Sequence, residues 1–210
     1  MSYMLQIVGF ALAFFLSAWL IGRGALSLLG VGERAEERTG AALLAAPTGI
    51  GLLAVTLFIL AALNALNAVA IGLVLGAETL LAGMLTNRSL AGRQQSAGAA
   101  ISGFARRNAY LLVCTVLVTV PLVMRALGAP LEWDEVSYHL PYVREYIAHG
   151  GLTVAEYLRF PLHSHNYQLL YAAALIFSSE AGAHMVHALS LIHISEPTRP
   201  RRQSRMPSSA

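Results

Sequence analysis

The stretch Ala41–Leu63 reads AALLAAPTGIGLLAVTLFILAAL and contains no charged side chain. An α-helix rises about 1.5 Å per residue, so a helix of this length covers the hydrocarbon core of a bilayer, which is about 30 Å thick. Pro47 and the glycines fit this interpretation, because membrane helices tolerate both residue types. The stretch therefore predicts a membrane-spanning helix.

The same pattern occurs three more times before residue 127. Charge-free or nearly charge-free apolar runs cover Met4–Ile21, Ala68–Leu85 and Tyr110–Met124. Hydrophobic residues make up 56% of the chain and charged residues only 12%, with a mean hydropathy of +0.60, which excludes an ordinary soluble domain. The sequence predicts an all-α, polytopic bundle of transmembrane helices, with residues 1–127 as a four-helix membrane region.

The arginines predict how this region is oriented. The linkers Gly22–Thr39 and Asn87–Asn108 are rich in arginine, whereas the turn Asn64–Asn67 has none. Basic residues favour the cytoplasmic side, so both linkers are predicted to be cytoplasmic. We then expect a multi-pass protein of the plasma (inner) membrane, with its N-terminus and the loop Gly128–His165 outside the cytoplasm. Residues 167–188 are predicted to begin a fifth membrane helix.

The last residues, 189–210, look like a translated sequencing adapter rather than part of the protein. A natural basic tail is the alternative, but engineered segments of this kind are excluded from fold arguments. The tail carries four arginines and one glutamate, so the net charge of +3 becomes zero without it. No nucleic-acid partner is therefore expected. The chain is interpreted as the N-terminal fragment of a longer protein.

The loop contains an acidic and aromatic stretch, Leu131–Tyr146, which we call the acidic segment. Apolar residues recur there at helical spacing, and Pro141 either lies in the first turn of the helix or kinks it. Gly150 and Gly151 are expected to end the helix. The tyrosines at 138, 142 and 146 are typical of a membrane interface, so residues 128–166 are predicted to form an extracytoplasmic loop with an interfacial helix lying flat on the membrane.

Two groups of polar residues in the loop are candidates for chemistry. Asp134 and Glu135 precede the helix, where they are either a solvated acidic cap or a general base or metal ligand. His163, His165 and Asn166 are either a partial metal site or polar interface residues. A divalent metal is one possible cofactor, but the sequence does not assign one, and no metal-binding residue is named.

The loop resembles the first extracytoplasmic loop of GT-C-type glycosyltransferases, the superfamily of the protein O-mannosyltransferases and the lipid A aminoarabinose transferases. The similarity lies in Trp133–Tyr138, Val143–Tyr146, His149–Gly151 and Arg159–Leu162. Two features differ. Four predicted spans precede the loop here, whereas those families usually have one, and Leu162–Asn166 lacks the Lys-Pro-Pro-type run of the aminoarabinose transferases.

The resemblance implies an inverting transfer of sugar from a polyprenyl-phosphate carrier to an acceptor hydroxyl at the outer membrane face. Asp134 would be the general base, and Glu135 would orient a neighbouring residue or a metal. Arg144 or Arg159 would neutralise the leaving lipid phosphate. The substrate-binding residues would be Tyr138, His139, Arg144, Arg159, His163, His165 and Asn166. The implied partners are the sugar donor, membrane lipid, and a glycan, lipid or protein acceptor. The fragment itself is expected to be inactive.

Glu78 supports a different interpretation. It lies inside the third predicted span, where a carboxylate is a candidate functional group. In a transporter or flippase-like subunit it would be the coupling group. The plainer alternative is a protonated or hydrogen-bonded glutamate that faces other helices. A non-enzymatic membrane scaffold is a third possibility.

Overall fold

The computed structural model describes residues 2–31, 38–90, 109–128, 133, 135–158 and 166–191. Every regular element in these ranges is helical, which confirms the predicted all-α fold. The elements are α1 (Ser2–Leu28), α2 (Arg38–Ala62), α3 (Ala68–Leu90), α5 (Ala109–Ala126), the π-helical η1 (Glu135–His139), α6 (Leu140–His149), α7 (Asn166–Phe177) and α8 (Glu180–Leu191).

Three of these helices are long and apolar enough to cross a membrane. The spans are Tyr3–Leu28, Gly40–Ala62 and Ala68–Thr86, and they match the first three predicted spans. Most of their surface is exposed in the isolated chain, as expected for helices whose outer faces contact lipid rather than water. The protein is thus a membrane protein. The fourth predicted span is also helical, as α5, but its crossing of the membrane stays a prediction.

Helices α1 and α2 cross at small residues that let the two backbones touch. A side chain at Gly22 would collide with the Ala45 carbonyl, and one at Gly49 would collide with the Ala18 carbonyl. Each helix therefore contributes two small residues four positions apart to the contact. This spacing is typical of membrane helix pairs, which associate by close packing because lipid is as apolar as their side chains.

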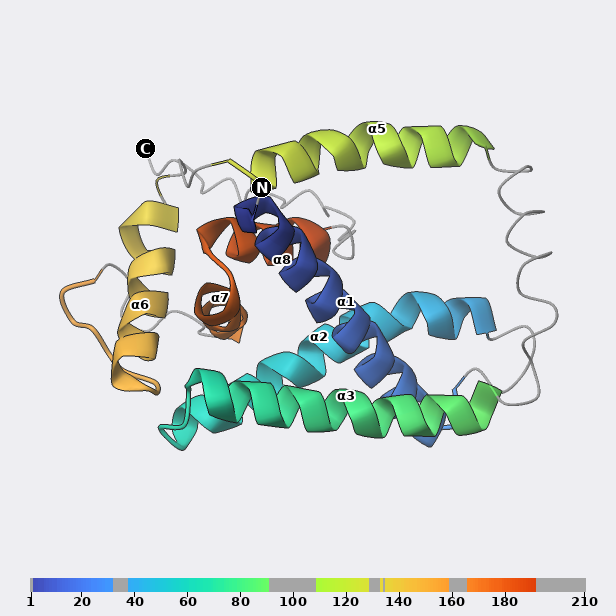
Figure 1. The fold of residues 1–210 in the computed structure, drawn as a ribbon, viewed down its shortest axis with the longest axis horizontal. Helices are drawn as coiled ribbons and strands as arrows, with labels where there is room; N and C mark the ends of the chain where they lie inside the picture. Colours follow the sequence, from blue (N-terminus) through green and yellow to red (C-terminus); the bar gives the residue numbers. More distant parts are fainter. Residues whose placement is uncertain are drawn as a thin grey trace, which may run out of the picture.

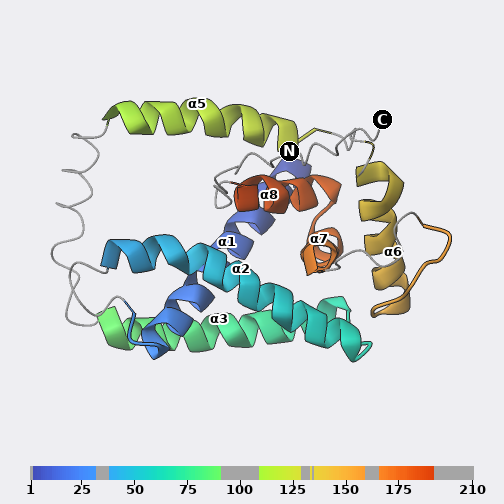
Figure 2. The same ribbon diagram turned by 180° about the vertical axis from the view of Figure 1, so that it is seen from behind.

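Figures 1 and 2 show how the helix ends are distributed along the longest axis of the molecule. The start of α2, the end of α3 and the start of α5 lie toward one end of this axis. The end of α2, the start of α3, the end of α5 and the whole of α6 lie toward the other. The helices that the two arginine-rich linkers connect thus have their connected ends toward the end of this axis opposite to α6.

The turn between α2 and α3 holds the end of α6 in place. The Leu66 amide donates to the Gly150 carbonyl at 2.8 Å, and the Leu152 amide donates to the Ala61 carbonyl at 3.2 Å. Gly151 is packed so closely against Asn64 and Ala61 that a Cβ atom would overlap both. The turn and the loop, both predicted to lie outside the cytoplasm, are therefore joined by backbone hydrogen bonds.

The single fifth helix predicted from Tyr167 onward is two helices in the structure. The chain breaks at Ser178–Ser179, where the Ser179 hydroxyl accepts the Gly182 amide at 3.4 Å, as a residue at a helix start does. Each helix has 12 residues, about 18 Å, which is too short to cross a bilayer. In Figure 1, α7 is seen almost end-on and α8 runs across it. Helix α8 continues to Leu191, while residues 192–210 lie outside the described ranges.

Candidate functional site

The acidic segment is helical where the structure describes it, and α6 has the ends that were predicted. Pro141 lies in its first turn, and Gly150 ends it in a left-handed conformation with φ of +67°. The Gly150 amide donates to the Ile147 carbonyl, and the Gly151 amide donates to the Tyr146 carbonyl at 3.1 Å. These bonds satisfy carbonyls that the helix would otherwise leave without a partner.

The tyrosines of the acidic segment point into the protein, whereas side chains expected at a membrane interface would face outward. Tyr138 is 7% exposed, and Tyr142 and Tyr146 are fully buried in the core with residues of α7. The four-residue spacing places all three on one helical face, and this face contacts α7. Burial raises the pKa of Tyr142, and burial together with the neighbouring Tyr142 raises the pKa of Tyr146 to about 12. The apolar face of α6 is therefore covered by protein, not by lipid.

Glu135, one of the two predicted catalytic carboxylates, contacts a histidine from α8. Its Oε1 atom lies against Nε2 of His184, close enough for an ion pair when the imidazole is protonated. The side chains are only 17% and 13% exposed. A carboxylate shielded to this degree needs a compensating partner, which His184 supplies.

Arg144, a predicted phosphate-binding residue, contacts a second residue of α8. Its guanidinium donates to the carboxylate of Glu180 at the surface, where the two side chains are 64% and 34% exposed. The charge of Arg144 is thus balanced within the protein. A phosphate that binds this arginine has to share it with Glu180 or displace that carboxylate.

His139 and Tyr138 lie together beside α7. Their ring centroids are 4.3 Å apart, and Nδ1 of His139 is 3.3 Å from the side-chain nitrogen of Gln168. Gln168 is almost completely buried. The contact orients the imidazole of His139, whose ring is partly accessible. Of these two predicted substrate-binding residues, only His139 presents a polar group near the surface.

Glu145 forms a separate polar group on the outer side of α6. Its carboxylate accepts a hydrogen bond from the hydroxyl of Tyr157, and His149 Nδ1 lies 3.4 Å from its other oxygen. The hydrogen bond to Glu145 raises the pKa of Tyr157. This group holds the loop after α6 against the helix, and it includes no predicted site residue.

Four predicted site residues lie outside the described residues: Asp134, Arg159, His163 and His165. Asn166 is the first residue of α7 and is exposed. Within the described part of the chain, no group of three or more His, Cys, Asp or Glu side chains is arranged to hold a metal ion. The structure thus brings together Glu135, Tyr138, His139 and Arg144 along the consecutive elements η1 and α6, all of them next to α7 or α8.

The sequence analysis missed the residues that hold this element. Glu180, Gln168 and His184 were not among the candidate site residues. One signal was available: Glu180 is the only carboxylate after Tyr167 in the apolar run, and His184 follows it by one helical turn. That spacing places an acid and a base on one face of α8.

Glu78 is hydrogen-bonded to a neighbouring helix, as the plainer of the two interpretations of this residue expects. The hydroxyl of Thr56 on α2 donates to its Oε1 atom at 2.6 Å. Its Oε2 atom is buried without a partner among the described residues. The pair joins α2 and α3 within their apolar spans.

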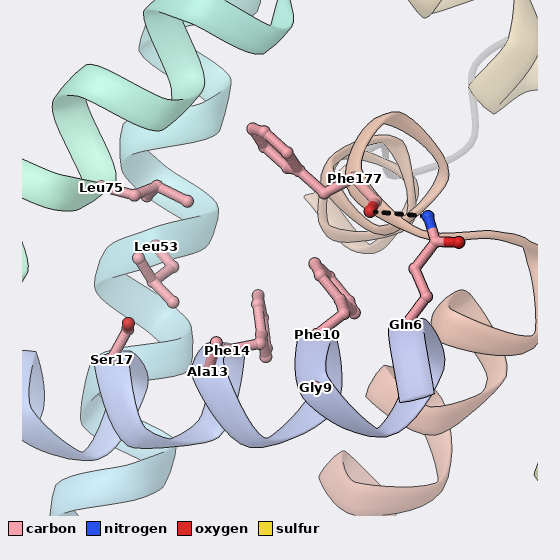
Figure 3. Close-up of a pocket in the computed structure, with 9 residues that line it drawn as sticks. All are labelled: Gln6, Gly9, Phe10, Ala13, Phe14, Ser17, Leu53, Leu75 and Phe177. Atoms are coloured by element: carbon pink, nitrogen blue, oxygen red, sulfur yellow. Dashed lines mark hydrogen bonds between the residues drawn. The ribbon is translucent and has the colours of Figure 1, made fainter. Parts of the chain in front are cut away.

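An apolar hollow of about 380 Å³ lies between α1, α2, α3 and α7. Figure 3 shows Phe10 and Phe14 of α1 projecting beside Phe177 of α7, with Leu53 and Leu75 across from them. The side chain of Gln6 bounds one end and donates to the Phe177 carbonyl at 3.4 Å. None of the predicted site residues lines this hollow.

Comparison with known proteins gives one partial match and no family. An uncharacterized protein of Shigella flexneri is 37% identical to this chain over 87 residues, which are 41% of this chain and 44% of that protein. The match thus spans less than half of the length of that relative. No family model matches the chain. No solved structure matches it either.

Proposed function

We propose that this chain belongs to an integral membrane glycosyltransferase. In this proposal it transfers a sugar from a polyprenyl-phosphate carrier to an acceptor hydroxyl at the outer face of the plasma membrane. The observation that carries the proposal is the contact with His184 of Glu135, which follows Asp134 in the sequence and begins the element that leads into α6. An acidic pair held at a membrane surface fits a base that acts on a water-soluble acceptor and a lipid-bound donor.

The arrangement of the helices supports the orientation within this proposal. Arginine-rich segments favour the cytoplasmic side, and the helices they connect have their connected ends toward the same end of the longest axis. Helix α6 lies toward the other end and is hydrogen-bonded to the arginine-free turn after α2. One orientation in the membrane therefore accounts for both the linkers and the loop.

The proposed reaction assigns separate roles to the charged residues. Asp134 takes the proton of the acceptor hydroxyl while the acceptor oxygen attacks the anomeric carbon. The bond from that carbon to the phosphate oxygen breaks, and the lipid phosphate leaves with the electron pair. Arg144 or Arg159 neutralises the phosphate, because guanidinium groups bind phosphate oxygens in a fork. His139, which is partly accessible and lies beside Gln168, is proposed to contact the sugar.

The hollow between α1, α2, α3 and α7 supports binding of a lipid. It is lined mainly by phenylalanine and leucine and lies among helices that span the membrane. Part of the polyprenyl chain of the donor is proposed to occupy it, because such a chain has the same apolar character as the lining. The sugar and the acceptor are not assigned.

The decisive experiment compares Asp134→Asn with Glu156→Gln in the full-length protein. Removing a general base lowers kcat by about 10²- to 10⁴-fold, so we expect a loss of this size for Asp134→Asn in transfer from a polyprenyl-phosphate sugar. Glu156 is an exposed carboxylate in the same loop, and Glu156→Gln should transfer sugar at the wild-type rate. Wild-type turnover by Asp134→Asn contradicts the assignment of the base.

A second candidate function, a transporter or flippase-like subunit, is favoured by the contact of Glu78 with Thr56 in the apolar spans. A carboxylic acid there can bind and release a proton as helices move. One variant distinguishes the two proposed functions. Glu78→Gln abolishes coupled transport but leaves sugar transfer in place.

A further inference from the structure

Helix α8 meets the acidic segment through two pairs, each of one acidic and one basic side chain, arranged in a fixed order. On α8, the acid Glu180 precedes the base His184 by one turn. On the facing element, the base Arg144 pairs with Glu180 and the acid Glu135 pairs with His184. A shift of one turn along α8 would bring an acid against an acid or leave a charge without a partner, so the two pairs select one alignment.

The two pairs differ in how far they are shielded from water. Glu135 and His184 are less than one-fifth exposed, whereas Arg144 and Glu180 are one-third exposed or more. Exposed ion pairs contribute little, but breaking a shielded pair leaves a charged group without compensation. The pair of Glu135 with His184 is therefore the stronger of the two constraints on the acidic segment.

We infer that His184 is a positioning residue, which through Glu135 fixes the start of η1. The catalytic meaning of this inference rests on the proposed function. Asp134, the base in that proposal, directly precedes Glu135 in the sequence. A displacement of the base by about 1 Å from its working position lowers the reaction rate by about 10²-fold. Holding the base in place would therefore preserve the rate.

Spin labelling tests the anchor without any assay of activity. Cys114 is the only cysteine, so a Cys114→Ser chain can carry a nitroxide at Val136→Cys, next to Glu135 on an exposed position. We expect both His184→Gln and Glu135→Gln to increase the mobility of this label in lipid nanodiscs. The double variant should increase it no further than either single change, because both remove the same contact.

Two comparisons make the labelling result specific. A label at Val154→Cys, exposed in the loop after α6, should keep its mobility in His184→Gln, because that loop is held by Ala61 and Glu145. Glu180→Gln, which breaks only the exposed pair, should change the label at position 136 less than His184→Gln does. An unchanged label at position 136 in His184→Gln, or additive effects in the double variant, would overturn the inference.

Kinetics of the full-length protein separate the anchor from the proposed reaction. We expect His184→Gln to lower kcat by about 10-fold or more while the KM for the acceptor changes by less than about 2-fold, since a misplaced base affects the chemical step more than binding. Equal kcat values in active wild-type and His184→Gln proteins would overturn the positioning role. A wild-type protein that transfers no sugar would instead overturn the proposed function, and the spin-label result would still decide whether His184 anchors the segment.

Discussion

The crossing of α1 with α2 and the junction of η1 and α6 with α8 are both helix contacts, but different forces select their geometry. At the crossing, Gly22 and Gly49 allow contact with the backbones of Ala45 and Ala18. At the junction, Glu135 and Arg144 meet His184 and Glu180. Within a membrane, close packing must provide the attraction, whereas near water oppositely charged pairs can set the alignment. Each contact should therefore respond to a different kind of substitution.

The largest effect is expected from Gly49→Val at the crossing. The new side chain would overlap the Ala18 carbonyl and its Cα atom, and a backbone cannot yield as a flexible side chain does. We expect a loss of about 3 kcal/mol or more in the free energy of unfolding, measured by SDS titration with circular dichroism. Gly51→Val is the matched control, because nothing lies within 4 Å of a Cβ atom at Gly51. Equal losses in the two variants would show that close packing at Gly49 is not what holds the helices.

A smaller effect is expected from Gly151→Ala, where the loop meets the turn after α2. The added methyl group would overlap the Asn64 side chain and come within 2.7 Å of the Ala61 carbonyl, which already accepts a hydrogen bond from Leu152. The side chain can move but the carbonyl cannot, so we expect a loss of about 1–3 kcal/mol in the same titration.

The control for this substitution is Gly76→Ala in the interior of α3. A Cβ atom there meets nothing within 4 Å, and alanine favours a helix more than glycine does. We expect this variant to be as stable as the wild type or slightly more stable. If Gly151→Ala were as stable as Gly76→Ala, the loop would not depend on its contact with the turn.

The contrast between the two contacts also explains what the sequence could predict. The spans Gly40–Ala62 and Ala68–Thr86 were predictable because the length and hydropathy of one continuous stretch decide whether it can cross a bilayer. The ends of α6 were predictable for the same reason, since Pro141 and Gly150 act on their own backbone. Each of these features depends on residues that are neighbours in the chain.

The remaining features depend on residues far apart in the chain. The face of Tyr142 and Tyr146 was expected at a membrane interface, and only the position of α7 shows that protein covers it. The partner of Glu135 is 49 positions later in the chain, on α8. The break at Ser178–Ser179 was missed because the apolar pattern continues through it, although the serines followed by Glu180 are typical of a helix start.

The smallest effect at neutral pH, and the one most specific to the acidic segment, is expected from Tyr146→Phe. The pKa of Tyr146 is about 12 in the folded chain, mainly because of burial and then because of Tyr142, against about 10 in an unfolded chain. Between these values the unfolded state has released the phenolic proton and the folded state has not. The stability present below about pH 10 is therefore lost as the pH rises through about 12. We expect Tyr146→Phe to lose less stability than the wild type between about pH 10 and pH 12, as measured by unfolding titrations at each pH. If both proteins lost the same stability at alkaline pH, water would reach the phenol of Tyr146. The tyrosine face of α6 would then not pack against α7.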